Sequence, residues 1–468
     1  MDYRLEKDSL GARQVPAGAY YGVQTVRAME NFQITGIPIS HYNRLIQALA
    51  CIKKAAALSN HELGILEEEK SRAITEACRE ARQGLLDEHF PVDVIQGGAG
   101  TSVNMNANEV LCNRALEIMG HLKGEYQYLH PNNHVNLSQS TNDVYPTALR
   151  IACIWYAKEL IPELKKLENS FERKGKEFSD IIKMGRTQLQ DAVPMTLGQE
   201  FNAFGVTIGE DVQRLEEAIK LLQEINMGAT AIGTGINTLP GYSELVSSRL
   251  ADITGLRLIR SRNLVEATSD TGVFVQLSGI LKRIGVKLSK ICSDLRLLSS
   301  GPYTGLREIN LPPVQPGSSI MPGKVNPVIP EMVNQVCYQV TGNDLTVTMA
   351  SESGQLQLNV FEPIIAFNLF QSLQVLTNAC SILRRKCIDG ITANRDKCMQ
   401  MVRESCGLTT ALVPRIGYEA AADLAREAMQ GEKSIYDLVL EKGLMSEEEL
   451  CECLDPNNMT RPRNFEMK

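Results

Sequence analysis

Residues 268–298 read TSDTGVFVQLSGILKRIGVKLSKICSDLRLL and limit the class of structure that this chain can form. Apolar residues recur there at three- and four-residue spacing, which is the period of an α-helix. A helix of about 30 residues is about 45 Å long, far beyond the roughly 11 to 12 residues of an average globular helix. Its apolar side chains cover more than one face, among them Phe274, Val275, Leu277, Ile280, Leu281 and Ile284. We therefore predict a long helix that packs against several others.

The same period recurs through most of the 468 residues. It predicts further helices at residues 43–58, 107–119, 147–178, 197–226, 327–350 and 355–388. Strand-like alternation is nearly absent outside the first segment, apart from possible hairpins near residues 235–242. We predict a mainly all-α protein with a central bundle of long helices. Neighbouring subunits would cover its wide apolar faces, although a buried core within one chain is an alternative.

Three blocks with different patterns follow one another in the sequence. We predict a mixed N-terminal domain at residues 1–140, a central helical-bundle domain at 141–392 and a small C-terminal helical domain at 393–468. The last block contains an expected helix at residues 434–442. It also contains a capping box, Ser446 to Glu449, that begins another helix.

The composition argues against several classes of function. The formal net charge is -7, whereas general binding of nucleic acid or of an anionic membrane needs clustered positive charge. No uninterrupted apolar stretch approaches the roughly 20 residues that cross a bilayer. The first residues, MDYRLEKDSLG, carry charges where a secretory signal has an apolar core. We therefore expect a cytoplasmic protein without nucleic-acid or membrane partners.

Cysteine and histidine give no sign of a metal or cofactor site. The twelve cysteines are scattered through apolar helical contexts, so we expect reduced thiols in the core. Cys451 and Cys453 are separated by one residue and have no second pair nearby, which argues against a zinc site. All six histidines lie before residue 135, so chemistry placed later runs without imidazole unless folding or assembly brings an early histidine to it. We expect no metal and no cofactor.

Four polar loops rich in Gly, Ser, Thr and Asn separate the predicted helices, at residues 97–109, 134–143, 185–194 and 315–327. Taken singly, each has an ordinary structural explanation, since Ser140, Thr141 and Asn142 could cap a helix and Lys324 could be a solvated charge. The last loop, however, combines paired serines, a lysine and an asparagine within ten residues. Hydroxyls, an amide and a compact cation on a flexible loop suit a small carboxylate substrate.

The run GSSIMPGKVN, residues 317–326, resembles the signature of the aspartase/fumarase superfamily. The other loops match the superfamily in the same order, from YYGVQT (20–25) to IGYE (416–419). This resemblance implies three domains and a homotetramer whose subunits share a twenty-helix core. It also implies four active sites, each built from loops of three subunits, which would account for the wide apolar faces.

Within the superfamily, the loops are more similar to the aspartase branch, whose members split L-aspartate into fumarate and ammonia. Thr101 in GTSVNMN and Thr141 in QSTND favour this branch, and Gln188 stands where fumarases carry His. Elimination of hydroxide needs a general acid, whereas an alkylammonium leaves as ammonia without one. Class II fumarase activity and a lyase for a substituted aspartate remain alternatives. A non-catalytic relative, like the related lens crystallins, is another, but the intact set Ser318, Lys324 and Asn326 argues against it.

Roles follow from the resemblance residue by residue. It implies that Ser318 is the base that removes the proton next to the side-chain carboxylate, and that loop N–H groups and positive charge must activate this weak acid. Developing charge on an enediolate would be held by fixed donors. The resemblance assigns the side-chain carboxylate to Thr101, Ser140, Thr141 and Ser319, the other carboxylate to Thr187, Lys324 and Asn326, and the amino group to Asn142 and Gln188.

Two positions depart from the superfamily pattern. Tyr303 follows Ser-Ser-Gly-Pro where relatives usually carry Arg, and Val413 stands where relatives commonly carry Asn. Both changes put a supporting contact or the amine specificity in doubt. His130, with Asn132 and Asn133, resembles a second anion-binding spot of fumarases, but a plain surface turn is our interpretation.

Overall fold

The computed structural model describes residues 2–431 and 433–462 and is mostly helical, which confirms the predicted fold class. The chain divides into two compact units. Unit 1 comprises Met1–Ile161, Gln213–Gly285 and Tyr338–Thr377, and unit 2 comprises Pro162–Val212, Val286–Cys337 and Asn378–Lys468. The predicted boundaries near residues 140 and 392 stay a prediction.

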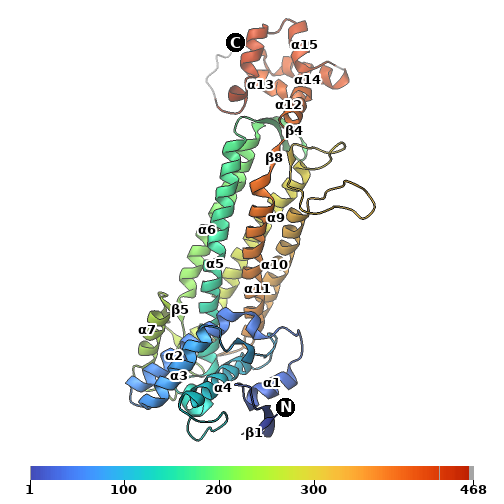
Figure 1. Ribbon diagram of the computed structural model, residues 1–468. Helices are drawn as coiled ribbons and strands as arrows, with labels where there is room; N and C mark the ends of the chain where they lie inside the picture. The colour runs from blue at the N-terminus through green and yellow to red at the C-terminus, as the bar shows by residue number, and fades with distance from the viewer. Residues whose placement is uncertain (1, 432, 463–468) are drawn as a thin grey trace. The chain divides into compact units, whose positions relative to one another are not determined.

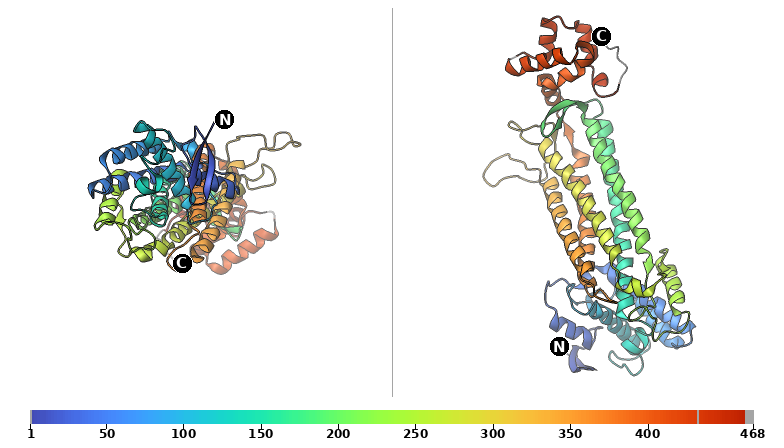
Figure 2. Two further views of the ribbon diagram at one scale, coloured as in Figure 1. Left: turned by 90° about the horizontal axis from the view of Figure 1, so that it is seen from below. Right: turned by 180° about the vertical axis from the view of Figure 1, so that it is seen from behind.

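Five long helices supply segments to both units and confirm the predicted central helices. They are α5 (Thr141–Glu177), α6 (Leu197–Leu222), α9 (Gly272–Leu298), α10 (Val328–Glu352) and α11 (Glu362–Lys386). Within each unit their segments run side by side, as Figures 1 and 2 show. Buried leucines, isoleucines and phenylalanines lie along these helices, including Leu164, Phe171, Phe201, Phe274 and Leu373, and the ring centroids of Phe171 in α5 and Phe201 in α6 lie 6.2 Å apart.

The long helices differ from the predicted ranges at their ends. The predicted helix 268–298 is broken at Asp270, whose carboxylate accepts a hydrogen bond from Gly272 N, so α8 (Leu264–Ser269) precedes α9. The predicted helix 355–388 begins only at residue 362, because the buried Asn359 amide donates to the last carbonyls of α10, at Ala350 and Ser351. Residues 224–225 pair with residues 259–260, which ends α6 at residue 222.

Unit 1 combines its helix segments with the N-terminal part of the chain. An antiparallel hairpin pairs β1 (Tyr3–Asp8) with β2 (Gly11–Pro16). Helix α3 packs on α2 and α4, and α7 also packs on α2. The bounds are α1 (Val23–Asn31), α2 (Asn43–Glu62), α3 (Glu68–Arg82), α4 (Thr101–Ile118), β5 (Glu224–Ile225), α7 (Tyr242–Thr254) and β6 (Ile259–Arg260). The possible hairpins near residues 235–242 were a wrong prediction, because this segment forms turns.

Unit 2 adds a helical C-terminal part and a hairpin to its helix segments. The capping box at Ser446 is present, as predicted. Apolar residues of the C-terminal helices, among them Leu408, Leu412, Leu424, Leu438 and Leu450, share one core with Ile182 and Met184 of the hairpin. The bounds are β3 (Ile182–Thr187), β4 (Gln190–Thr196), β7 (Ile309–Asn310), β8 (Thr392–Ala393), α12 (Arg395–Glu404), α13 (Thr409–Ile416), α14 (Tyr418–Gln430), α15 (Ile435–Glu441), α16 (Glu447–Cys453) and α17 (Pro456–Met459).

Most of the cysteines are core residues, as expected. All twelve cysteines lie in the described part of the chain, none forms a disulfide there, and ten are buried. Among the described residues, no helix combines the length and apolar character that crossing a membrane requires.

Candidate active site

The structure divides the predicted site residues between the two units. Unit 1 carries the four residues Thr101, Ser140, Thr141 and Asn142, and unit 2 carries the six residues Thr187, Gln188, Ser318, Ser319, Lys324 and Asn326. Each group is therefore described within its own unit.

In unit 1, the buried carboxylate of Asp143 fixes the first turn of α5. It accepts hydrogen bonds from the backbone N–H groups of Ser140, Gly228 and Thr230, at 3.0, 3.1 and 2.9 Å. Burial raises the pKa of Asp143 to about 7, whereas these hydrogen bonds favour its charged form. Asp143 thereby ties Ser140 to the loop at residues 228–230, a contact between segments far apart in the sequence.

Asn142 is held on both its main chain and its side chain. Pro146 lacks an N–H group, so the Asn142 carbonyl has no partner four residues later in the helix. The amide of Asn226 donates to this carbonyl at 3.0 Å, and the Asn142 amide donates to Ala231 O at 2.7 Å. This replacement allows α5 to begin six residues before the predicted residue 147. A cavity of about 410 Å³ lies beside this turn, lined in part by Asn136, Gln139, Ser140 and Thr230.

Thr101 begins α4 directly after Gly100. Gly100 has φ +89°, and a Cβ atom built on it would lie 2.4 Å from the ring of Tyr145 in α5. The amide of Asn104 donates to the Thr141 hydroxyl at 3.1 Å. These two contacts join the first turns of α4 and α5, so unit 1 brings together two of the predicted carboxylate-binding segments. Helix N-termini carry unpaired N–H groups and positive partial charge, which favours an anion there.

Replacing Gly100 by Ala is expected to destabilise the protein by about 2–4 kcal/mol, because overpacking against Tyr145 adds to the strain of a positive φ. Denaturant-induced unfolding measures the change. Gly98→Ala is the matched control, since Gly98 has the same φ of +89° but its nearest neighbour atom would lie 3.7 Å away. Equal losses in both variants would show that the contact with Tyr145 does not matter.

In unit 2, a tight hairpin presents Thr187 and Gln188. Thr187 pairs with Gln190 across a two-residue turn in which Gln188 has φ 51° and Leu189 φ 64°. Two positive φ values in a two-residue turn are typical of type I′, which matches the twist of paired strands. Gln188 is therefore exposed at the tip. The sequence predicts only a polar loop here, because the turn lacks the Asn or Gly that normally marks type I′.

A buried group of charges lies beneath this hairpin. Glu308 is fully buried and contacts the cations of Lys183 at 2.7 Å and Arg186 at 2.6 Å. Lys183, which is 2% exposed, also pairs with Glu200 at 2.6 Å. Arg186 directly precedes Thr187 in β3, so these ion pairs hold the strand that carries two predicted site residues. The sequence gives no signal that joins residue 308 to residues 183 and 186.

The loop with Ser318 extends away from the helices of unit 2 in Figure 1, between α9 and α10. Its ends meet, since Gly317 N donates to Lys324 O at 2.8 Å and the Asn326 amide donates to Gly317 O at 2.6 Å. Inside the loop, Ser318 Oγ accepts hydrogen bonds from Ile320 N at 3.2 Å and Met321 N at 3.0 Å. A hydroxyl oxygen with two N–H donors has a stabilised alkoxide form.

Ser319 and Lys324 are exposed on the same loop. Within the described residues Lys324 takes part in no ion pair, so its positive charge is open to an anionic ligand. No group of three His, Cys, Asp or Glu in the described segments is arranged to hold a metal ion.

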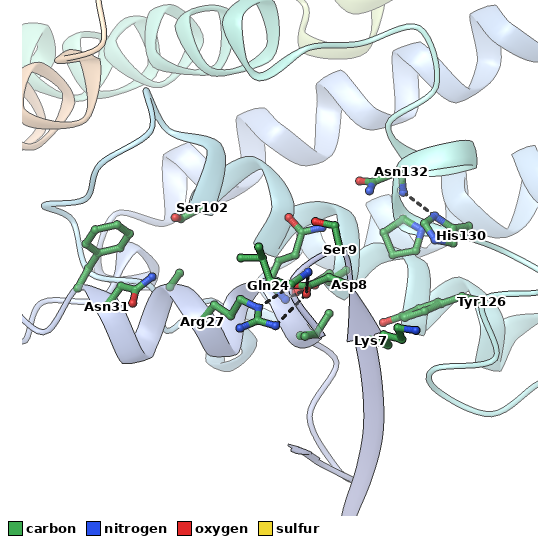
Figure 3. A pocket seen from close by; sticks show the side chains of 16 residues that line it. Lys7, Asp8, Ser9, Gln24, Arg27, Asn31, Ser102, Tyr126, His130 and Asn132 are labelled. Atoms are coloured by element: carbon green, nitrogen blue, oxygen red, sulfur yellow. Dashed lines mark hydrogen bonds and ion pairs between the residues drawn. The ribbon is translucent and has the colours of Figure 1, made fainter. Parts of the chain in front are cut away.

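A second cavity in unit 1 lies near His130. Figure 3 shows this pocket of about 580 Å³, with Arg27 paired to Asp8 and with His130 at its other side. His130 Nδ1 accepts hydrogen bonds from Asn132 N and Asn133 N, which form the ordered turn after it. Burial lowers the pKa of His130, so the ring favours its neutral form. These contacts agree with a structured turn.

Comparison with known proteins places the chain in a family. A family model described as a lyase matches residues 11–342, and one described as the C-terminus of fumarase C matches residues 408–461. The first match covers more than half of the chain, so the chain belongs to this lyase family. The predicted resemblance to the aspartase/fumarase superfamily is confirmed.

Individual relatives describe the similarity more closely than the family models do. An aspartate ammonia-lyase of Pseudomonas fluorescens is 59% identical over 467 residues, which cover 100% of this chain and 98% of the relative. A Brucella melitensis crystal structure described as a fumarate lyase and delta crystallin has a TM-score of 0.96 at 56% identity, covering 98% of this chain and 100% of that one. A class II fumarase from Schistosoma mansoni has a TM-score of 0.94 at 37% identity, covering 99% and 100%. The fold is therefore similar to that of a fumarate lyase and to that of a class II fumarase, and the sequence is more similar to the aspartate ammonia-lyase than to that fumarase.

Proposed function

We propose that this chain is an aspartate ammonia-lyase, which converts L-aspartate reversibly into fumarate and ammonia. The observation that carries the proposal is the hydroxyl of Ser318, whose Oγ accepts two backbone hydrogen bonds within its own loop. This environment favours the deprotonated oxygen that a base requires. The substrate is supported by the 59% identity to an enzyme named aspartate ammonia-lyase.

The proposed reaction begins when Ser318 Oγ takes the proton from the carbon next to the side-chain carboxylate. The electron pair moves into that carboxylate and forms an enediolate, which donors from Thr101, Ser140, Thr141 and Ser319 would stabilise. The C–N bond then breaks, and the amino group leaves as ammonia near Asn142 and Gln188. Gln188 cannot supply a proton as a general acid, and an ammonium leaving group does not need one.

The other carboxylate of aspartate would bind Lys324, with Thr187 and Asn326 as hydrogen-bonding partners. Asn326 uses one amide hydrogen on Gly317 O, which leaves the second for the substrate. The open charge of Lys324 would attract the carboxylates of the substrate to the loop. No cofactor is part of this proposal.

We also propose that the active unit is a homotetramer in the cytoplasm, with each site assembled from three subunits. Large apolar side chains stay exposed on the long helices of a single chain, for example Val206 at 56%, Val286 at 57% and Leu345 at 62%. Large apolar side chains exposed on long bundle helices are typical of surfaces that neighbouring subunits cover. Light scattering of the active protein tests the assembly, and a stable active monomer would contradict it.

The activity itself is tested by following fumarate formation with the purified protein. We expect fumarate from L-aspartate and none measurable from L-malate, because Gln188 replaces the imidazole that dehydration would use. 3-Methylaspartate is assayed separately, and faster formation of methylfumarate from it than of fumarate from L-aspartate would indicate a lyase for a substituted aspartate. Faster product formation from malate than from aspartate would indicate a fumarase instead. No product from millimolar L-aspartate would contradict the proposal.

A further inference from the structure

Four buried or half-buried polar side chains form a cluster behind Thr141 in unit 1. Lys53 of α2 is 0% exposed, and its Nζ donates to Asn136 Oδ1 at 2.9 Å. Asn104 and Asn108, one turn apart on α4, donate from Nδ2 to the same oxygen at 3.2 and 3.1 Å. Burial lowers the pKa of Lys53 to about 7, while the negative charge of Asp143 opposes this effect.

The direction of each hydrogen bond in this cluster follows from its neighbours. The Asn136 amide nitrogen lies 3.2 Å from the carbonyl oxygen of Gln139, which can only accept a hydrogen bond. Oδ1 of Asn136 therefore faces Lys53, whose amino group donates to it. Asn104 must then present Nδ2, and not its oxygen, to Asn136.

The same nitrogen of Asn104 also determines where the hydroxyl hydrogen of Thr141 can point. Nδ2 carries two hydrogens, and the second points to Thr141 Oγ1 at 3.1 Å. Since Thr141 Oγ1 accepts this bond, its own hydrogen points elsewhere. The carbonyl of Leu137, four residues earlier, lies before α5 and already receives Asn60 Nδ2 at 2.9 Å and Gln139 Nε2 at 3.1 Å.

We propose that Asn104 is a positioning residue that makes the Thr141 hydroxyl a hydrogen-bond donor toward a carboxylate bound at the start of α5. Among the described residues no protein group accepts the Thr141 proton, so it is available to a ligand. This inference rests on the proposed function, because it uses Thr141 as a substrate-binding residue. Asn104 acts only through Thr141 and does not touch the substrate.

Packing alone does not explain the cluster. Asn104 is 1% exposed and Asn108 is 0% exposed, yet Oδ1 of each has no hydrogen-bond partner in the described chain. A buried polar atom without a partner costs stability, and apolar side chains of similar size would avoid that cost. A role in orienting Thr141 gives the amide of Asn104 a reason to be present.

Asn104→Asp tests the proposal because it keeps the shape but replaces the donor by an acceptor. The Thr141 hydroxyl would then donate to Asp and turn away from the substrate. We expect kcat/KM for L-aspartate to fall about 10²-fold, as for the loss of an oxyanion donor. Asn108→Asp is the matched control, since it changes the same contact to Asn136 on the same helix without touching Thr141, and we expect kcat/KM within about twofold of wild type.

A double variant separates orientation from general damage. In Thr141→Val the hydroxyl is absent, so adding Asn104→Asp should lower kcat/KM no further. Equal losses in Asn104→Asp and Asn108→Asp, or additive losses in the double variant, would overturn the inference. Asn104→Leu and Asn108→Leu replace the Asp variants if these do not fold.

The affinity for succinate, an unreactive dicarboxylate, distinguishes this inference from the proposed function. If the wild-type protein releases no fumarate from L-aspartate, the proposed function fails. Calorimetry with succinate on the same variants then decides the inference by itself. Weaker binding in Asn104→Asp alone supports it, and equal binding in both Asp variants, or no binding by wild type, overturns it.

Discussion

Ser318→Ala is expected to lower kcat for fumarate formation from L-aspartate by at least about 10³-fold while the protein keeps its fold. The side chain of Ser318 makes its hydrogen bonds within its own loop, to Ile320 N and Met321 N, so its loss leaves the helices unaffected. Removal of Oγ eliminates the group that would accept the proton. Initial rates and thermal unfolding of the two proteins measure both parts of the expectation.

Ser319→Ala is the neighbouring control for this prediction. Ser319 is exposed on the same loop and is proposed to bind a carboxylate, so its loss should reduce turnover by about 10²- to 10³-fold. A second readout is the exchange of the C3 proton of L-aspartate with deuterated solvent. Exchange should disappear in Ser318→Ala but persist in Ser319→Ala, because only the former lacks the base. Turnover that is unchanged in Ser318→Ala would reject Ser318 as the base.

The helices could be predicted because their signal is local and repeated. Wide apolar patterns of three- and four-residue spacing identified all five long helices, which the structure confirms. Their ends were predicted less well, since distant side chains determine them. Asn226 replaces the hydrogen bond that Pro146 cannot make, and Asn359 ends α10 from nine residues beyond Ala350. Asn226 lies 84 residues from Asn142, so no window around the start of α5 contains that information.

Prediction of the candidate site from the sequence is limited in the same way. The loops could be located in the sequence because small polar residues are unusual between long helices, and the hydroxyl, amide and lysine side chains can be recognised one by one. The direction of each hydrogen bond could not be predicted. That the amide of Asn104 faces Thr141 depends on Asn136, which in turn depends on the carbonyl of Gln139. Likewise, the two-residue turn at Gln188 and Leu189 has positive φ values without the residues that predict them.

Glu308→Ala is expected to destabilise the protein by about 3–5 kcal/mol, which is typical when one partner of a buried ion pair is removed. Glu308 is 0% exposed and is the anion that both Lys183 and Arg186 contact. Lys183 keeps Glu200, but no other salt bridge is seen for Arg186 in the described structure. The midpoint of thermal unfolding and the denaturant-dependent free energy of unfolding both measure this loss.

Loss of these ion pairs should also weaken substrate binding, because they lie next to a proposed site residue. Arg186 lies next to Thr187, so a loosened β3 would displace a proposed carboxylate-binding hydroxyl, and KM for L-aspartate should rise in Glu308→Gln, which keeps the size of the side chain. Asp180→Ala serves as control, because it removes a salt bridge to Arg395 in which both side chains are more than half exposed. Exposed pairs contribute little, since water already solvates both charges. Similar losses in stability for Glu308→Ala and Asp180→Ala would mean that burial of the charges beneath the hairpin has no energetic importance.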